Sequence, residues 1–250
     1  MISEGIFLAM GLPAAIVAHR NGDLKTAALH YQRALDQKDH KAVLFQNYGA
    51  LLRETGNIDK AYSLYQQAIT LFPDHQGIKL NFANLIRDTH PRDAFNLHLS
   101  IVQAKLIDNE SSLSDKDFFP LIDILENLGF YSWSYEICRR AVLTCGPTPS
   151  LLLLLFKLAT SPKKSILNQI STEKLINSLQ ECLGDFTDTQ RAEYFFSLSK
   201  LEFQRNKFDQ SYETLLKARS CLIEARSSSP DEVDKSIKLD NVYSWNMACS

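Results

Sequence analysis

Residues 42–75 have the sequence AVLFQNYGALLRETGNIDKAYSLYQQAITLFPDH, in which bulky and small side chains recur at helical spacing. Counted from Ala42, bulky residues stand at positions 4, 7, 11 and 24, and small residues at positions 8, 20 and 27. These residues are Phe45, Tyr48, Leu52 and Tyr65, and Gly49, Ala61 and Ala68. Gly56 suits the left-handed backbone that often ends a helix, and Pro73 cannot continue a helix interior. The stretch therefore predicts two antiparallel helices that cross closely where the small residues lie.

The same order of residues recurs along the chain at a spacing of about 34 residues. Residues 8–41 repeat it clearly, and residues 76–109, 115–148 and 192–225 repeat it with substitutions. Residues 149–191 have helical periodicity but match the order poorly, so we expect an irregular helical pair there. Five or six units exceed the roughly three that a stable stack of repeats needs.

The last unit carries two local signals of its own. Thr187 and Gln190 have the spacing of a capping box at the start of its first helix. Asn206 replaces the glycine that ends that helix, and asparagine is the next best residue for a left-handed backbone. Residues 226–250 are predicted to be a linker followed by the start of a further repeat helix.

The order of small and large residues resembles the tetratricopeptide repeat (TPR) family, and residues 42–75 match it at every signature position. The resemblance implies an all-α fold, an antiparallel helix-pair solenoid with a right-handed superhelix. It also implies that TPR repeats cover residues 1–148 and that the first helix of each pair lines a concave face.

Composition and motifs give no sign of catalysis, of a cofactor or of a nucleic-acid partner. The chain has 27 Lys and Arg against 29 Asp and Glu, a net charge of −2, whereas binding to phosphates needs a clustered basic excess. It contains no cationic helix suited to a membrane surface and no phosphate-loop, dinucleotide or zinc-protease motif. Its six histidines are separated in sequence from its five cysteines, so we expect no metal site. We therefore predict that the chain is not an enzyme and needs no cofactor.

The first residues and the cysteines indicate a cytoplasmic location. Residues 5–18 are largely apolar, but the four residues before them include no Lys or Arg, as a signal peptide would require. These residues fit a repeat helix instead. The cysteines are odd in number and lack C-x-x-C spacing, which favours reduced thiols.

Polar residues recur at the positions that commonly face the groove in TPR proteins. Asparagines occupy positions 6 and 9, arginines occupy position 12 of two units, and a histidine and an arginine take positions 12 and 13 of the first. They are Asn47, Asn81 and Asn84, Arg53 and Arg87, and His19 and Arg20. Asparagine amides can bind an extended peptide backbone, and guanidinium groups can hold carboxylates. The asparagines resemble the asparagine ladder in the TPR region of O-linked GlcNAc transferases.

Two functions follow from this pattern. The first is a protein-protein interaction module that holds an extended peptide or partner protein, with an acidic side chain or terminus, in the concave groove. The alternative is the substrate-presenting N-terminal region of a bacterial glycosyltransferase or sulfotransferase. Trp245-Asn246 resembles the junction repeat of the glycosyltransferase group, which leads into the catalytic part. A simpler interpretation of the site is that Arg53 and Arg87 pair locally with acidic residues such as Glu54 and Asp88, which needs no ligand.

Overall fold

The computed structural model describes residues 11–37, 41–107, 113–160 and 169–228. These residues form α-helices joined by short turns, with one short 3₁₀ helix and no strand in the described ranges, which confirms the all-α prediction. Residues 229–250, where the sequence predicts the start of a further repeat helix, lie outside the described part. The predicted right-handed superhelix stays a prediction.

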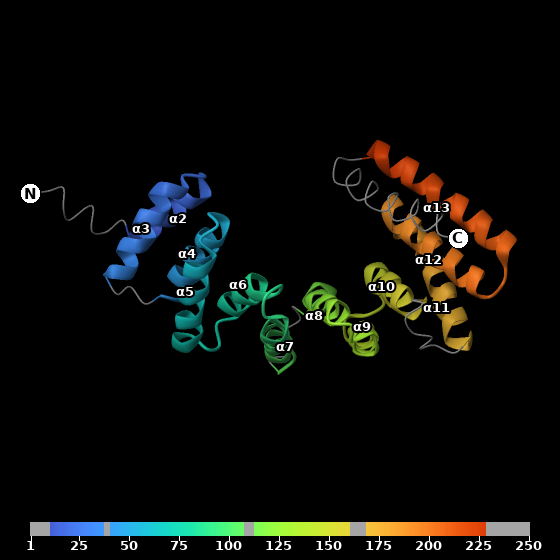
Figure 1. The fold of residues 1–250 in the computed structure, drawn as a ribbon, viewed down its shortest axis with the longest axis horizontal. Helices are drawn as coiled ribbons and strands as arrows, with labels where there is room; N and C mark the ends of the chain where they lie inside the picture. The colour runs from blue at the N-terminus through green and yellow to red at the C-terminus, as the bar shows by residue number, and fades with distance from the viewer. Residues whose placement is uncertain (1–10, 38–40, 108–112, 161–168, 229–250) are drawn as a thin grey trace, which may run out of the picture. The chain divides into compact units, whose positions relative to one another are not determined.

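The chain divides into two compact units, residues 1–112 and residues 113–250. The helices of each unit can be followed in Figure 1. In the first unit they are α2 (Gly11–Arg20), α3 (Leu24–Asp36), α4 (Ala42–Glu54), α5 (Ile58–Leu71), α6 (Gln76–Ile86) and α7 (Pro91–Ile107). In the second they are α8 (Asp115–Asn127), α9 (Tyr131–Cys145), α10 (Pro149–Thr160), α11 (Gln169–Glu181), η1 (Leu183–Asp185), α12 (Asp188–Gln204) and α13 (Phe208–Ser228).

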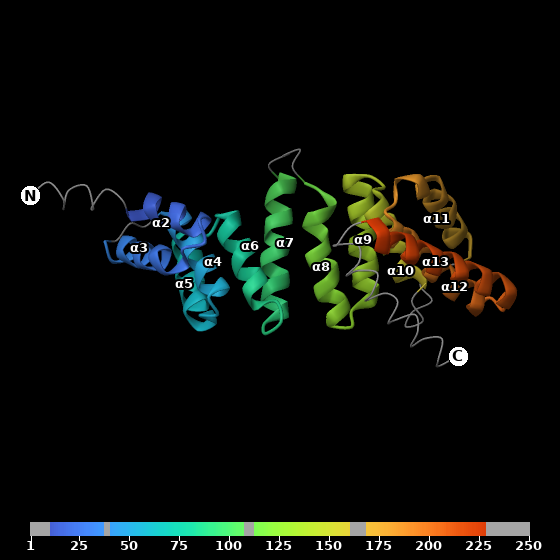
Figure 2. The same cartoon turned by 90° about the horizontal axis from the view of Figure 1, so that it is seen from above.

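In the first unit, successive helices pack in pairs: α2 with α3, α4 with α5, and α6 with α7. Figure 2 shows α6 and α7 side by side. The small residues lie in the core of these pairs, with Ala27, Ala61 and Ala68 fully buried. Gly49 meets the ring of Tyr65, which leaves no room for a Cβ atom. The close crossing predicted for residues 42–75 is therefore present, because the missing side chain of Gly49 admits the tyrosine.

The turn inside most pairs uses one left-handed residue. Gly22, Gly56 and Gly129 have φ angles of 77°, 76° and 79°, and Asn206 has a φ of 59°. The next residue after each of them donates its backbone N–H to a carbonyl in the last turn of the first helix. For example, the N–H of Asn57 donates to the carbonyl of Leu52 over 2.8 Å. The substitution of glycine by Asn206 therefore preserves the turn, as predicted.

In the second unit, two serines stand where the pattern prefers alanine. Ser134 is fully buried, and its hydroxyl donates to the carbonyl of Phe130, the residue just before α9, 3.2 Å away. The hydroxyl of Ser211 donates across the pair to the carbonyl of Ser199, 2.8 Å away. Both hydroxyls are thus satisfied without spreading the helices apart.

The predicted capping box is confirmed at the start of α12. The amide N–H of Gln190 donates to the Thr187 hydroxyl over 3.2 Å, and the amide N–H of Thr187 donates to Oε1 of Gln190 over 3.0 Å. This cap fixes the point at which α12 begins, directly after the short helix η1.

Candidate functional site

The candidate groove lies on the first helices of the three pairs in the first unit. These helices contact one another in turn, since α2 packs on α4 and α4 packs on α6. All seven groove residues predicted from the sequence stand on these three helices or at their ends. The structure therefore brings the candidate residues onto one layer of helices.

Asn81 is held by the protein itself. Its side-chain amide donates to the backbone carbonyl of Gln46 over 3.4 Å, and the hydroxyl of Tyr65 donates to the same carbonyl over 3.3 Å. Burial raises the pKa of Tyr65 to about 12, and the nearby Asn81 amide and Arg53 charge oppose the rise. Asn81 thus joins α6 to α4, so at least one amide hydrogen is used inside the fold.

Asn47 and Asn84 are freer than Asn81. Asn47 is half-buried and Asn84 is exposed. Neither side chain forms a hydrogen bond with another residue of the described ranges. Their amides are therefore available to the backbone of a ligand, which the sequence had predicted for all three asparagines.

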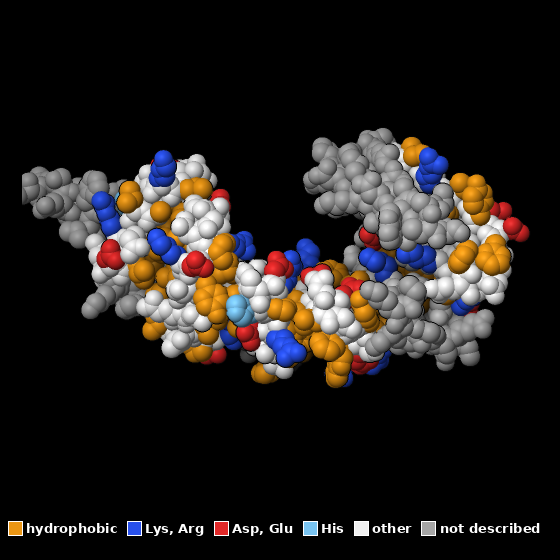
Figure 3. Space-filling view, viewed as in Figure 1, with side chains coloured by type: hydrophobic (Ala, Val, Ile, Leu, Met, Phe, Trp, Pro, Cys, Tyr) orange, Lys and Arg blue, Asp and Glu red, His pale blue; other side chains and the backbone are white. Residues whose placement is uncertain are grey.

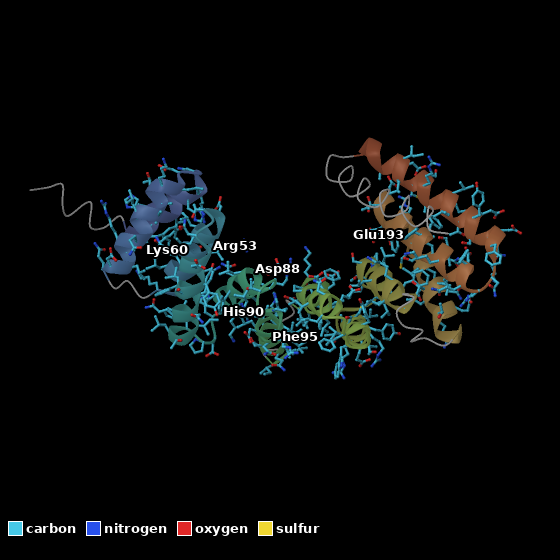
Figure 4. The ribbon with its side chains drawn as sticks, in the orientation of Figure 1. Arg53, Lys60, Asp88, His90, Phe95 and Glu193 are labelled. Carbon is cyan, nitrogen blue, oxygen red and sulfur yellow. The ribbon has the colours of Figure 1, made fainter. Side chains whose placement is uncertain are left out.

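The two arginines at position 12 are exposed, and they differ in their surroundings. Arg87 lies 3.8 Å from the carboxylate of Asp88, a long and solvent-exposed ion pair of the kind that contributes little stability. Arg53 forms no ion pair with a residue in the described part of the chain. Figure 4 shows Arg53 at the end of α4 and Asp88 just beyond α6. The nearby carboxylate of Asp88 therefore partly neutralises the charge of Arg87, whereas Arg53 remains available to a ligand.

His19 has a structural contact that the sequence did not predict. Its Nε2 lies 3.1 Å from a carboxylate oxygen of Glu54, and its Nδ1 lies 3.3 Å from the hydroxyl of Tyr31. The imidazole therefore links α2 to both α3 and α4. Arg20 is exposed beside it.

His98 on α7 was not singled out from the sequence. It is 3% exposed, and burial lowers its pKa, with a further lowering by the charge of Arg87. His98 is therefore a neutral core imidazole, and its buried Nε2 has no hydrogen-bond partner in the described part of the chain. Its spacing at the centre of a long amphipathic helix is the signal that could have marked it as buried.

The opposite side of the first two pairs has a hollow of about 380 Å³. It separates the second helices α3 and α5, and its base is formed by α4. The residues that line it are Gln32, Leu35, Tyr48, Leu52, Asp59, Lys60, Ser63, Leu64 and Gln67. This hollow could not be predicted from the sequence, because it depends on how two successive pairs are spaced.

Over the part of the chain that the structure describes, no group of three or more His, Cys, Asp or Glu side chains is arranged to hold a metal ion. Within the same ranges, no helix combines the length and apolar character needed to cross a membrane. Cys138, Cys145, Cys182 and Cys221 carry free thiols.

Comparison with known proteins identifies the fold. No family model and no curated protein sequence matches the chain. Among solved structures, YrrB, described as a TPR protein with an unusual peptide-binding site, aligns with a TM-score of 0.54 at 13% identity, over 84% of this chain and 97% of YrrB. PilF of Pseudomonas aeruginosa aligns with a TM-score of 0.59 at 12% identity, over 93% of this chain and 96% of PilF. A TPR protein from Parabacteroides merdae aligns with a TM-score of 0.53 at 15% identity, over 95% of this chain and 85% of that chain.

These similarities confirm the predicted TPR-type fold, and at such low identity they concern the fold alone. They give no support to the transferase alternative. The chain therefore has the helix-pair architecture of TPR proteins.

Proposed function

We propose that this chain is a non-enzymatic interaction module that binds an extended peptide or partner protein along α2, α4 and α6. One observation supports the proposal most strongly. The first helices of three successive pairs form one layer, and on it the side chains of Asn47, Asn84 and Arg53 form no hydrogen bond or ion pair with another described residue. Exposed polar groups aligned across repeats suit a ligand that extends along the layer.

The chemistry of these residues favours an acidic peptide. A side-chain amide can donate to and accept from a peptide backbone, as Asn47 and Asn84 would. Arg53 and Arg87 would bind a carboxylate, since guanidinium groups match its planar geometry. Arg20 would extend the basic row beside His19, whose ring nitrogens contact Glu54 and Tyr31. Asn81 would orient α6 and contact the ligand with its remaining amide atoms.

The similarity in fold to YrrB, described as having a peptide-binding site, agrees with this proposal. A cytoplasmic location agrees with the free thiols of the described cysteines. The near-neutral charge of the chain favours a protein ligand over nucleic acid.

The test is a selection of random peptides displayed on phage against the purified chain. The enriched sequence is then synthesised with a fluorophore, and its affinity is measured by anisotropy. We expect enrichment of Asp and Glu, and a loss of affinity of tenfold or more in Arg53→Glu/Arg87→Glu. That loss corresponds to about 1.4 kcal/mol or more.

The matched control is Arg139→Glu/Arg140→Glu, which makes the same change in net charge on α9. These arginines are exposed and pair with Glu136. If both double variants lost affinity for the peptide equally, the loss would be explained by the change in net charge alone. That result would contradict a groove on the first unit.

A further inference from the structure

The hollow between α3 and α5 has the size and lining of a second binding site. Its volume of about 380 Å³ lies at the small end of the range for ligand sites. A space of this size suits one or two side chains of a peptide better than a large cofactor. Because α3 and α5 are second helices of their pairs, the hollow lies away from the layer that carries the groove residues.

The base of the hollow is apolar. Leu52 and Leu64 are buried there, Leu35 is half-buried, and the ring of Tyr48 completes the base. These side chains are already ordered by packing within their own helix pairs. A ligand that contacts their exposed surface in the hollow therefore has little further side-chain entropy to remove. An apolar side chain inserted here would exchange water for hydrocarbon contacts.

One wall is formed by Gln32 on α3, which lies in a chain of hydrogen bonds between Tyr48 of α4 and Asp36 of α3. The Tyr48 hydroxyl donates to Oε1 of Gln32 over 2.9 Å, and Nε2 of Gln32 donates to the Asp36 carboxylate over 2.9 Å. The two bonds hold the Gln32 side chain in place. A preformed polar wall lowers the entropy lost when a ligand binds beside it.

The other wall is a face of α5. Lys60, Ser63 and Gln67 recur there at intervals of three and four residues, so they lie along one side of the helix. Figure 4 shows Lys60 between α3 and α5, and in Figure 3 charged side chains on this face lie among hydrophobic ones. The exposed amide of Gln67 is suited to the backbone of an extended chain.

The two charged side chains of this wall, Asp59 and Lys60, differ in how favourably they would interact with a charged ligand. Both Asp59 and Lys60 stand in the first turn of α5. A carboxylate is stabilised at a helix N-terminus, whereas an ammonium group is destabilised there. Lys60 forms no ion pair with any residue that the structure describes. An incoming carboxylate therefore complements Lys60, while Asp59 is already compensated by its helix.

We infer that the hollow between α3 and α5 is a second peptide-binding site, which takes a bulky apolar side chain flanked by an acidic residue. The apolar side chain rests on Leu35, Leu52, Leu64 and Tyr48. The acidic residue binds Lys60, and the peptide backbone contacts Gln67. This site does not depend on the groove along α2, α4 and α6.

The experiment uses the full chain carrying Arg53→Glu/Arg87→Glu, so that ligands of the groove are disfavoured. Random displayed peptides are selected on it, and the enriched sequence is measured by fluorescence anisotropy in the same background. We expect a motif of a large apolar residue beside Asp or Glu. Ser63→Trp, which fills the hollow from an exposed position, should weaken binding at least tenfold, and Lys60→Glu should weaken it several-fold.

Matched controls stand outside the hollow on the same helices. Gln66→Trp adds the same ring to α5, and Lys25→Glu makes the same charge change on α3; both should bind like the parent. Far-ultraviolet circular dichroism and melting temperature verify that each variant folds. The inference is overturned if no peptide is enriched, or if the enriched peptide binds Ser63→Trp as tightly as the parent. Either result leaves the groove proposal standing, since that proposal is tested on Arg53 and Arg87.

Discussion

The ring of Tyr65 occupies the space into which a Cβ atom on Gly49 would project, with the tyrosine hydroxyl oxygen 2.7 Å from that position. Tyr65 is fully buried, and its hydroxyl is bonded to the Gln46 carbonyl. The ring therefore cannot move aside without losing a hydrogen bond and core packing. This one contact sets how closely α4 and α5 approach.

We expect Gly49→Ala to lower the free energy of unfolding by about 1–3 kcal/mol, the usual cost of overpacking a core. Urea denaturation measures it. Gly77→Ala is the control, because the Cβ there would meet only the end of the flexible Gln46 side chain. That variant should be neutral or slightly stabilising, since alanine is the better helix former. Equal destabilisation by both changes would contradict the role of Tyr65.

Tyr65 also predicts a dependence of stability on alkaline pH. Burial raises its pKa from 10.0 to about 12 in the folded chain. A raised pKa stabilises the fold fully below the unfolded value, and this contribution is lost as the pH rises from about 10 towards 12. Tyr65→Phe has no group to ionise, so its urea midpoint should fall less than that of the wild type over this window. Parallel curves for the two proteins would show that the ionisation of Tyr65 is not coupled to folding.

The asparagines should separate into a structural and a surface class. Asn81→Ala removes the bond to the Gln46 carbonyl and should cost about 0.5–1 kcal/mol of stability. Asn47→Ala should change stability by less than about 0.5 kcal/mol and should weaken the peptide selected in the groove test. Asn47 is therefore the cleaner probe of binding. If Asn47→Ala bound that peptide normally, Asn47 would have no place in the groove.

The cap of α12 gives a prediction for the second unit. Thr187→Ala should destabilise the fold by about 1 kcal/mol, because it leaves the amide N–H of Gln190 without its acceptor. Thr187→Ser keeps the hydroxyl and should retain most of that stability. Thermal unfolding of the three proteins compares them directly, and a serine variant as unstable as the alanine variant would show that the hydroxyl is not the stabilising group.

The cysteines should react with iodoacetamide at different rates. Burial raises the pKa of Cys138 to about 12, and its thiol donates to the Leu151 carbonyl over 3.6 Å. Since the thiolate is the reactive form, Cys138 should be labelled after the half-buried Cys182 in the native chain and at the same rate in urea. Mass spectrometry of timed samples measures both, and early labelling of Cys138 would mean that α9 and α10 open readily.

The helix pairs could be predicted because their determinants are local. Within one unit, the positions of Gly49, Gly56 and Ala61 indicate where the helices cross and where the turn lies. Asn206 could likewise be recognised as a residue that replaces the turn glycine. The contacts between units could not be predicted in this way. The His19–Glu54 contact and the hollow beside Lys60 depend on the distance between successive pairs, which no single repeat specifies. The internal use of Asn81 escaped prediction for the same reason.

Two serines, the buried Ser134 and the half-buried Ser211, bear on how such a chain can change in sequence. Each stands where the repeat pattern prefers alanine, and each hydroxyl finds a backbone carbonyl within hydrogen-bonding distance. A change from alanine to serine at these positions therefore adds one oxygen atom, whose hydroxyl donates to a backbone carbonyl that is already present. The positions that define the repeat can then change one by one while the helix spacing persists. Such a chain can keep the architecture of helix pairs when its sequence no longer shows the full repeat pattern.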